Sequence, residues 1–483
     1  MIHACPVEQT DVLRFCGEVL AQANEDAMAR EAYRKLGDIS KLMELFVKRQ
    51  LWADAAKLAD DHEGKFDSSV FLPYAEHLVM EDRCEEAMQA YKKAGRKDLS
   101  RKILQELTYN SVVEMRFKDA SYFFWLLARE LTMEASLDSM ESQLQLECEH
   151  NADLYYAYSN IHAFVTDPFT SQSPDLLFQV SRFIINSLGS AENIPYGISK
   201  AATLYTLARQ AMKLGCFKLA RHAYDRLNRL QIPSRWQDDV EHDMLVVQAK
   251  PVRDDADQLP VCYRCSSINP LLNPFTNKFA KGDVCTVCGH PFVRSFINFD
   301  ILPLVEFVPD PSISDEEAIE LIRTAPSGRG GSPRASSGKG GGDWNESKIG
   351  EADVMNFGSQ DEEEQKRPEV GGSLPPGVNP AELFSSCLNN TLEGQANAMS
   401  YIPVTVDTTT LLHGMQRSDV FVCRPSSANK RATFYKNMLP EIAIAISQNC
   451  HRFFHLEDFE FEYLSKNCCP FSRLKDVGEY GSL

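Results

Sequence analysis

The chain has 483 residues, of which 43% are hydrophobic and 24% are charged. This composition matches ordinary globular proteins and excludes a wholly disordered or collagen-like chain. The formal net charge of -18 argues against bulk binding to nucleic acid or to anionic membranes, because an acidic surface is repelled by phosphate groups. We detect no signal peptide and no apolar run that approaches the length of a membrane span.

Residues 1–250 are predicted to form a tetratricopeptide-like helical solenoid. An aromatic residue or a cysteine is followed three residues later by alanine at four places: Trp52/Ala55, Cys84/Ala87, Phe117/Ala120 and Phe217/Ala220. The first three lie 32 and 33 residues apart, a period typical of such helical hairpins. A generic helical bundle is the alternative. The stretches near residues 150 and 183 lack the pattern, so we expect an irregular middle.

Two glycines are predicted to end helices within this region. Gly37 follows the helical pattern of Ala29, Ala32 and Tyr33, and Gly95 follows a similar pattern at 87–94. A glycine directly after a helical stretch favours a left-handed C-terminal cap.

Residues 251–322 are predicted to form a four-cysteine zinc ribbon followed by strands and a short helix. The 14 cysteines of the chain are too sparse for a disulfide scaffold, and four of them have the spacing of two zinc knuckles: Cys262-x2-Cys265-x19-Cys285-x2-Cys288. Four thiolates close a tetrahedral shell, so the predicted Zn2+ is structural. A redox pair or four unrelated buried cysteines are the alternatives. We expect His290 to be a bystander.

The ribbon is followed by predicted strand, helix and linker. Residues 296–309 favour one or two β-strands, and 312–323 favour a helix with Ser314 as its N-cap. Residues 323–380 are predicted to be a disordered linker, rich in glycine and charge, which cannot bury enough apolar surface to fold. We interpret it as an insertion rather than as a docking tail.

Residues 381–483 are predicted to form a degenerate domain that resembles a zinc ribbon, with strands at 401–407 and 419–424. A second candidate metal site is weaker and comprises Cys450, His455, Cys468 and Cys469. Ser447 and Ser472 stand where two knuckles would carry cysteine. The alternative is a metal-free fold held by the packing of Phe453, Phe454 and Phe471.

The sequence therefore predicts a mainly α protein, in which an α-solenoid precedes small β-rich zinc-ribbon modules. No catalytic motif or small-molecule cofactor motif is present, so we expect a non-enzymatic scaffold. One alternative is a zinc-ribbon nucleic-acid-binding protein, supported by basic residues that alternate with aromatic ones: Arg264, Lys278, Lys281 and Arg294. Another is a RING-like ubiquitin ligase, which needs eight metal ligands.

Several segments resemble the intraflagellar transport protein 122 family. They are FLPYAEHL at 71–78, DASYFFWLL at 119–127, LARHAYDRL at 219–227, CYRCSSINPLLN at 262–273, CTVCGHPF at 285–292, LVEF at 304–307, SDEEAIELI at 314–322, YIPVTVD at 401–407 and the closing CHRFFHLEDFE and NCCPF within 450–471. The resemblance spans the chain except for the linker and is to the C-terminal part of the family protein, because no β-propeller repeats precede the solenoid.

The resemblance implies a subunit of intraflagellar transport complex A that supports retrograde ciliary transport, cilium assembly and protein localisation to cilia. It implies other complex A subunits and adaptors for ciliary membrane-protein cargo as partners, with no nucleic acid and no membrane span. The implied locations are the cilium, the basal body and the cytoplasm. The four ribbon cysteines match the family, whereas two family cysteines of the second module correspond to Ser447 and Ser472.

Overall fold

The computed structural model describes residues 10–62, 71–134, 139–167, 169, 172–189, 194–274, 282–324, 380–396, 398, 400–424 and 431–475. The predicted disordered linker lies outside these residues, except for its first two positions and its last. The chain divides into two compact units, Met1–Gln258 with Pro470–Leu474, and Leu259–Cys469 with Lys475–Leu483. The prediction of a mainly α protein with a helical N-terminal region is confirmed.

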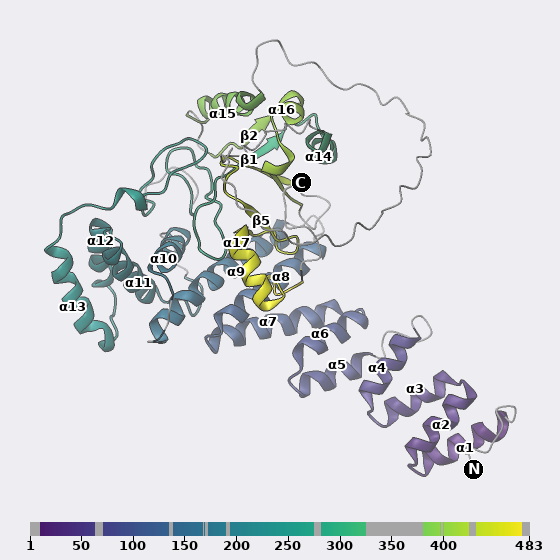
Figure 1. Ribbon diagram of the computed structural model, residues 1–483. Coiled ribbons are helices and arrows are strands. Elements are labelled where there is room, and N and C mark those ends of the chain that lie inside the picture. The colour runs from purple at the N-terminus through teal and green to yellow at the C-terminus, as the bar shows by residue number, and fades with distance from the viewer. Residues whose placement is uncertain are drawn as a thin grey trace, which may run out of the picture. The chain divides into compact units, whose positions relative to one another are not determined.

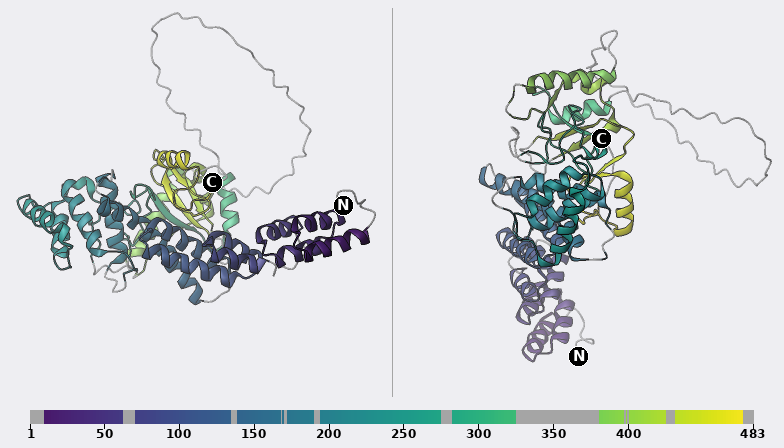
Figure 2. Two further views of the ribbon diagram at one scale, coloured as in Figure 1. Left: turned by 90° about the horizontal axis from the view of Figure 1, so that it is seen from below. Right: turned by 90° about the vertical axis from the view of Figure 1, so that its left-hand side faces the viewer.

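Helices follow one another throughout the first unit, and successive helices lie side by side (Figure 1; Figure 2, left). In chain order they are α1 (Thr10–Gln22), α2 (Asp26–Leu36), α3 (Ile39–Lys48), α4 (Trp52–Asp61), α5 (Phe71–Met80), α6 (Cys84–Lys93), α7 (Lys97–Val113), α8 (Phe117–Glu134), α9 (Ser139–Thr166), α10 (Pro174–Leu188), α11 (Lys200–Lys213), α12 (Phe217–Leu227) and α13 (Ser234–Gln248). The short 3-10 helix η3 (Ala256–Gln258) follows α13.

The same tight turn joins many of these helices. The residue two positions before the second helix has a left-handed backbone at Asn24, Gln50, Asp82, Met115 and Gly215. The next amide then donates to a carbonyl oxygen five residues earlier, as the Leu51 amide does to Phe46 at 2.9 Å. This bond belongs to the Schellman motif, which satisfies carbonyl groups at a helix end.

The predicted glycine caps are also confirmed, because Gly37 and Gly95 have φ of 67° and 72°. At the turns before α2, α4, α6 and α8, by contrast, the left-handed residue is not glycine. The left-handed conformation therefore recurs at these turns more regularly than any one residue type does.

The repeated alanines occupy equivalent places in their helices. Each aromatic residue or cysteine of the sequence pattern is the first residue of α4, α6, α8 or α12, so each alanine is the fourth. All four alanines are buried: Ala55, Ala87, Ala120 and Ala220. A methyl side chain at this position lets the neighbouring helix approach closely, which is why the period is visible in the sequence.

The middle of the first unit departs from this regularity, as expected. Helix α9 has 28 residues, so it does not fit a short repeat hairpin. Ser173 caps α10 by accepting a hydrogen bond from the Leu176 amide at 3.2 Å. Tyr155 and Tyr158 of α9 bond the backbone at Tyr196 and Ser199, which connects this long helix to the start of α11.

A short segment near the end of the chain belongs to the first unit by its contacts. The Phe471 ring meets Tyr156 edge-on at 5.1 Å, and Arg473 lies over the Tyr122 ring at 5.0 Å and pairs with Asp119 at 2.6 Å. Phe471 therefore packs against helix α9.

The second unit contains two small sheets and four helices among its described residues (Figure 1). Its strands are β1 (Leu304–Pro309), β2 (Val404–Val406), β3 (Val420–Cys423), β4 (Thr433–Asn437), β5 (Ile444–Ile446) and β6 (Phe453–His455). Its helices are α14 (Asp315–Thr324), α15 (Pro380–Ala396), α16 (Thr408–His413) and α17 (Leu456–Lys466), with the 3-10 helix η4 (Arg417–Asp419). The predicted Ser314 cap is confirmed, because its hydroxyl accepts from the Glu317 amide at 3.2 Å.

The larger sheet has the strand order β2-β1-β4-β3. Strand β1 pairs in parallel with β2 through Phe307 and Val404, and antiparallel with β4 through Phe307 and Phe434. The sequence placed β1 in a domain at 251–322 and its neighbours in another at 381–483. The sheet instead joins both segments in one unit, because β1 is a central strand whose two hydrogen-bonding edges are each completed by strands from the later segment.

The core beside this sheet is built from both segments. Phe307 of β1 meets Phe384 of α15 and Phe434 of β4, with ring centroids 6.1 and 5.4 Å apart. Ile319 and Ile322 of α14 are buried in the same cluster. Each apolar group removed from water here stabilises the association of the two segments.

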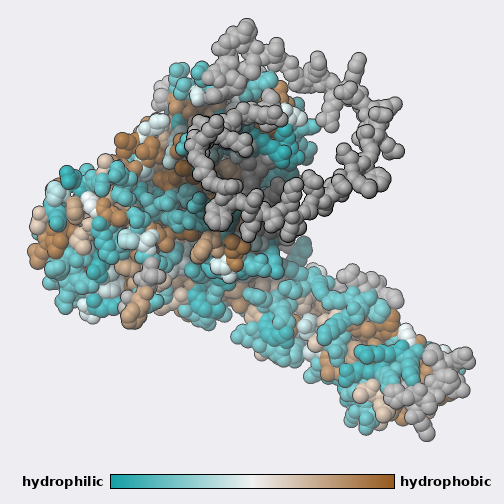
Figure 3. Space-filling view, viewed as in Figure 1, coloured by the Kyte–Doolittle hydropathy of each residue, from teal (hydrophilic) through white to brown (hydrophobic). Residues whose placement is uncertain are grey.

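No helix in the described part of the chain is long and apolar enough to cross a bilayer. On the face shown in Figure 3, hydrophilic residues cover most of the first helices, with hydrophobic residues scattered among them.

We predict that the alanine contacts set the stability of the first unit. Ala87→Glu places a charge where the side chain is 0% exposed, and we expect it to lower the free energy of unfolding by about 3–5 kcal/mol. The matched control is Gln89→Glu, on an exposed position of the same helix, which should stay within about 0.5 kcal/mol of the parent. Urea unfolding followed by circular dichroism measures both; equal losses would contradict the repeat register.

We also predict that the second unit survives a cut between α14 and α15. A protease site introduced between residues 325 and 379 should be cleaved without separating the two products, because β1 and α14 pack against β2, β4 and α15. Co-elution in native size-exclusion chromatography is the expected result. Phe307→Ala, which removes a fully buried ring, should weaken this association; separation of the unmutated products would contradict the shared core.

Candidate metal centre

The structure brings the four predicted ribbon cysteines together. The sulfur atoms of Cys262, Cys265, Cys285 and Cys288 all lie within 4.8 Å of one another. Sγ–Sγ distances are 3.7 Å between Cys262 and Cys288 and 3.6 Å between Cys265 and Cys285. Three of the four residues are buried, and Cys265 is half-buried. Four thiols converging on one point in a shielded place are the donor set of a closed structural zinc site.

Each pair of cysteines is carried by the same hydrogen-bonded turn, which we call the knuckle turn. At residues 262–267, the Cys262 amide donates to Ser267 O at 3.0 Å and the Ser266 amide to Cys262 O at 2.7 Å. At 285–290, the Cys285 amide donates to His290 O at 2.8 Å and the Gly289 amide to Cys285 O at 3.0 Å. The fifth residue of each turn is left-handed, with φ of 53° and 74°.

The thiols strongly perturb one another. Hydrogen bonding, first of all from Cys262, lowers the pKa of Cys265 to about 6 and holds the pKa of Cys285 far below its ordinary value. The same contacts raise the pKa of Cys262. Four mutually repelling thiolates need a cation to hold them at these distances, and a bound divalent ion deprotonates such thiols outright.

A second layer of polar groups surrounds the thiols and was not found by sequence reasoning. The Ser267 hydroxyl lies 3.0 Å from Cys265 Sγ and 3.5 Å from Cys285 Sγ. Buried Asn269 accepts from the Thr286 amide at 2.8 Å and from the Thr286 hydroxyl at 2.9 Å, and its amide nitrogen donates to Ser267 O at 3.1 Å. These contacts fix the ligand-bearing loops relative to each other, the usual task of groups behind metal ligands.

His290 is a bystander, as the sequence indicated. It is 2% exposed, and burial, aided by Arg264, lowers its pKa to about 4. Its neutral ring accepts a hydrogen bond at Nε2 from the Glu306 amide at 3.3 Å. The histidine thereby attaches the second knuckle to strand β1.

Arg264 attaches the first knuckle to the later part of the chain. Its guanidinium is buried, donates to Cys288 O at 3.2 Å and Ile402 O at 2.6 Å, and lies over the Tyr401 ring at 5.0 Å. Arg294 is also buried, and it pairs with Asp283. These two arginines therefore do not form the basic surface on which the nucleic-acid alternative depended; Lys278 and Lys281 lie outside the described residues.

The second predicted cluster is only partly assembled. Cys450 and Cys469 are buried, with their sulfur atoms 3.9 Å apart. His455 ends β6 and donates its amide to the Ser295 hydroxyl at 3.4 Å, and Cys468 is half-buried. Among the described residues, Cys450, His455, Cys468 and Cys469 do not bring their ligand atoms within 4.8 Å of one another. The spacing of the cysteines and histidine did not reveal which two would meet.

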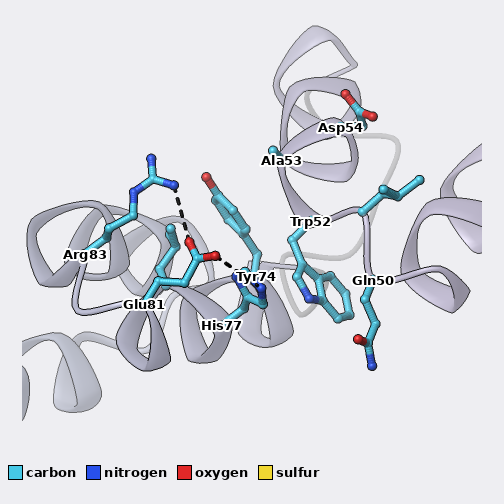
Figure 4. Close-up of a pocket in the computed structure, with 10 residues that line it drawn as sticks. Gln50, Trp52, Ala53, Asp54, Tyr74, His77, Glu81 and Arg83 are labelled. Atoms are coloured by element: carbon cyan, nitrogen blue, oxygen red, sulfur yellow. Dashed lines mark ion pairs between the residues drawn. The ribbon is translucent and has the colours of Figure 1, made fainter.

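The first unit carries a surface pocket between α4 and α5 (Figure 4). Trp52 and Tyr74 line it, and Glu81 pairs with both Arg83, at 3.5 Å, and His77, at 3.7 Å. Three charged groups at this pocket are thus engaged with each other, while Asp54 pairs with Arg30 at 3.3 Å. The pocket lies between two successive helices of the first unit.

Comparison with known proteins connects both units to one family. The family model described as IFT122, TPR domain matches residues 6–202, and the model described as IFT122, zinc ribbon domain matches residues 256–305. The intraflagellar transport protein 122 homolog of Danio rerio is 37% identical over 466 residues, which is 95% of this chain and 36% of that protein. The homologs of Mus musculus and Homo sapiens are each 34% identical, over 97% and 96% of this chain.

The chain spans about a third of the length of these curated relatives, since the aligned residues make up 36%, 37% and 35% of them. The similarity nevertheless runs through both units.

We predict that Ser267 strengthens metal binding at the four cysteines. A hydroxyl that donates to a thiolate stabilises its negative charge, so Ser267→Ala should lower zinc affinity about 10–100-fold. Ser267→Thr keeps the hydroxyl and is the matched control, whereas Cys285→Ser removes a ligand and should abolish stoichiometric zinc. Chelator competition on the full chain measures all three; an unchanged affinity for Ser267→Ala would contradict the role of the hydroxyl.

Proposed function

The chain belongs to the intraflagellar transport protein 122 family, and we propose that it is a non-enzymatic scaffold subunit of intraflagellar transport complex A. The single observation that carries this proposal is the sequence identity to the homologs, which covers 95% of the chain and includes both units. An unrelated protein that had only one domain in common with this family would be similar to it in that domain alone.

In this role the chain would support retrograde ciliary transport, cilium assembly and the localisation of proteins to cilia. Its partners would be other complex A subunits and adaptors for ciliary membrane-protein cargo. It would occupy the cilium, the basal body at its base and the cytoplasm. A stack of helical hairpins suits such a role because its edges and grooves are long and each hairpin contributes separately to binding.

We further propose that Cys262, Cys265, Cys285 and Cys288 hold one structural Zn2+. The ion would supply the cross-link that a small ribbon lacks, since a module with so few strands buries little apolar surface. With all four positions taken by thiolates, no open coordination site would remain for substrate or water. This supports a scaffold rather than a hydrolytic function.

The two alternative functions have less support. A nucleic-acid-binding ribbon would need exposed cations, yet Arg264 and Arg294 are buried and bonded within the protein. A RING-like ligase would need two four-ligand sites, and the described residues contain one such group.

We predict that the chain, tagged and expressed in ciliated cells, co-purifies with complex A subunits identified by mass spectrometry. Gln89→Glu is the folded control and should recover the same subunits. Ala87→Glu should disrupt the first unit, and Cys285→Ser should disrupt the ribbon of the second. A loss of complex A subunits with one variant alone would show which unit contacts them. Recovery of no complex A subunit by the folded parent chain would contradict the proposed function.

A further inference from the structure

The four-cysteine site is partly covered by a residue from far later in the chain. Cys262, Cys285 and Cys288 form a buried cluster, and Leu392 of α15 packs against it. Phe292, which follows the second knuckle, packs against the same cluster. Leu392 lies outside residues 251–322, the segment that the sequence predicted as the ribbon module. The apolar cover over the thiols therefore comes from two separate segments of the chain.

One face of α15 extends from the core beside the larger sheet to the thiols. Residues spaced three or four apart lie on one face of a helix, and this face carries Phe384, Leu388, Leu392 and Gln395. Phe384 and Leu388 are buried in the core beside the sheet, and Leu392 packs against both that core and the cysteine cluster. The early turns of α15 are thus anchored to the sheet, and a later turn contacts the metal centre.

A chain of hydrogen bonds connects the end of α15 to the ribbon. Gln395 is 2% exposed, its side-chain oxygen accepts from the Ile402 amide at 2.7 Å, and its nitrogen donates to Ser400 O at 2.7 Å. The Arg264 guanidinium donates to Ile402 O at 2.6 Å and to Cys288 O at 3.2 Å. The segment after α15 is therefore bonded on one side to the helix and on the other to both knuckles.

We propose that α15 is a lid over the four-cysteine metal site, in which Leu392 shields the thiols while Gln395 and Arg264 hold the lid in place. Arg264 and Gln395 are positioning residues, because they act on the site through the backbone of Cys288 and Ile402. The inference rests on the proposed zinc site and is independent of the proposed scaffold role.

Shielding matters because zinc leaves a thiolate site when protons, water or competing ligands reach the sulfur atoms. The ligands must stay deprotonated to hold the ion, and the apolar shell around a metal site controls the access of solvent. Cys265 is half-buried, whereas the other three cysteines are buried. An apolar side chain packed on that buried cluster therefore slows the exchange of the ion and the chemical modification of the free thiols.

The first test measures zinc release from the full, zinc-loaded chain to an excess of the chromogenic chelator 4-(2-pyridylazo)resorcinol. Leu392→Ala should release zinc about tenfold faster than the parent, a loss typical of groups behind metal ligands. Leu388→Ala is the matched control, since it is the same change one turn earlier on the same face, in the sheet core and outside the cysteine cluster.

This pair of variants separates shielding from general destabilisation. Leu388 is 8% exposed, whereas Leu392 is only partly buried. If the two leucines served stability alone, Leu388→Ala would lower the free energy of unfolding more and would also release zinc faster. The lid predicts the opposite order for zinc release, with Leu392→Ala the faster of the two. Urea unfolding of both variants measures the stability for comparison.

The second test uses the full, reduced chain after its metal has been removed. Iodoacetamide should alkylate Cys262, Cys285 and Cys288 faster in Leu392→Ala than in the parent or in Leu388→Ala, as followed by mass spectrometry of the modified peptides. This measurement requires no bound ion. It therefore still tests the lid if the parent is found to hold no zinc, a result that would contradict the zinc site itself.

Two results would overturn the lid. One is equal zinc release by the parent and Leu392→Ala; the other is faster release or faster alkylation in Leu388→Ala than in Leu392→Ala. If Leu392→Ala fails to fold, which near-ultraviolet circular dichroism reports, Gln395→Ala decides instead. It removes the hydrogen bonds to residues 400 and 402 and should also accelerate zinc release, so a rate equal to that of the parent would count against the proposal.

Discussion

The second unit depends on the pairing of strand β1 with strands that come much later in the chain. Phe307 aligns with Val404 on one side and with Phe434 on the other. Both hydrogen-bonding edges of β1 are therefore paired with other strands. The zinc-ribbon sequence precedes β1 directly, and His290 bonds its backbone at Glu306. The ribbon is thereby bonded to β1, and β1 is in turn paired with β2 and β4, which come later in the chain. Loss of that pairing would leave the ribbon and the later strands without a common core.

The same constraint explains why the domain limits could not be predicted from the sequence. Local signals identified the strands at 304–309, 404–406 and 420–423 within the expected ranges, and the Ser314 cap was recognisable from its residue type. Strand partners are not encoded locally, because a period-two pattern states which face is buried and not which strand lies alongside. A composition break at 323–380 looked like a domain boundary, yet the chain returns to the same sheet after it.

The helical unit was predictable to the extent that its contacts impose a residue type. Ala87 and Ala220 must be small because another helix packs on them, so the period appears in the sequence. The Schellman turns repeat just as regularly, but they are specified by backbone hydrogen bonds that Gln50, Asp82 and Met115 all permit. A left-handed backbone is uncommon for residues such as glutamine and methionine, and no sequence rule would have placed it there. The turn conformation thus repeats along the helices although the residue type at the turn does not.

The metal centre shows the same division between spacing and surroundings. The two C-x2-C pairs identified the four thiols that meet. Each knuckle turn directs two cysteines that are three positions apart towards the same point. Spacing alone could not tell Cys468 from Cys469, since adjacent residues differ in burial and direction only once the fold is known. Serine near sulfur has two different environments here. Ser267 lies outside the ligand shell, within hydrogen-bonding distance of a thiol, whereas Ser447 stands where a second knuckle would carry cysteine and is fully buried. A hydroxyl in the first environment can stabilise a thiolate that binds the ion. A hydroxyl in the second environment stands in place of a thiolate. This reduces the negative charge and the number of strong donors that an ion beside Cys450 and Cys469 would find.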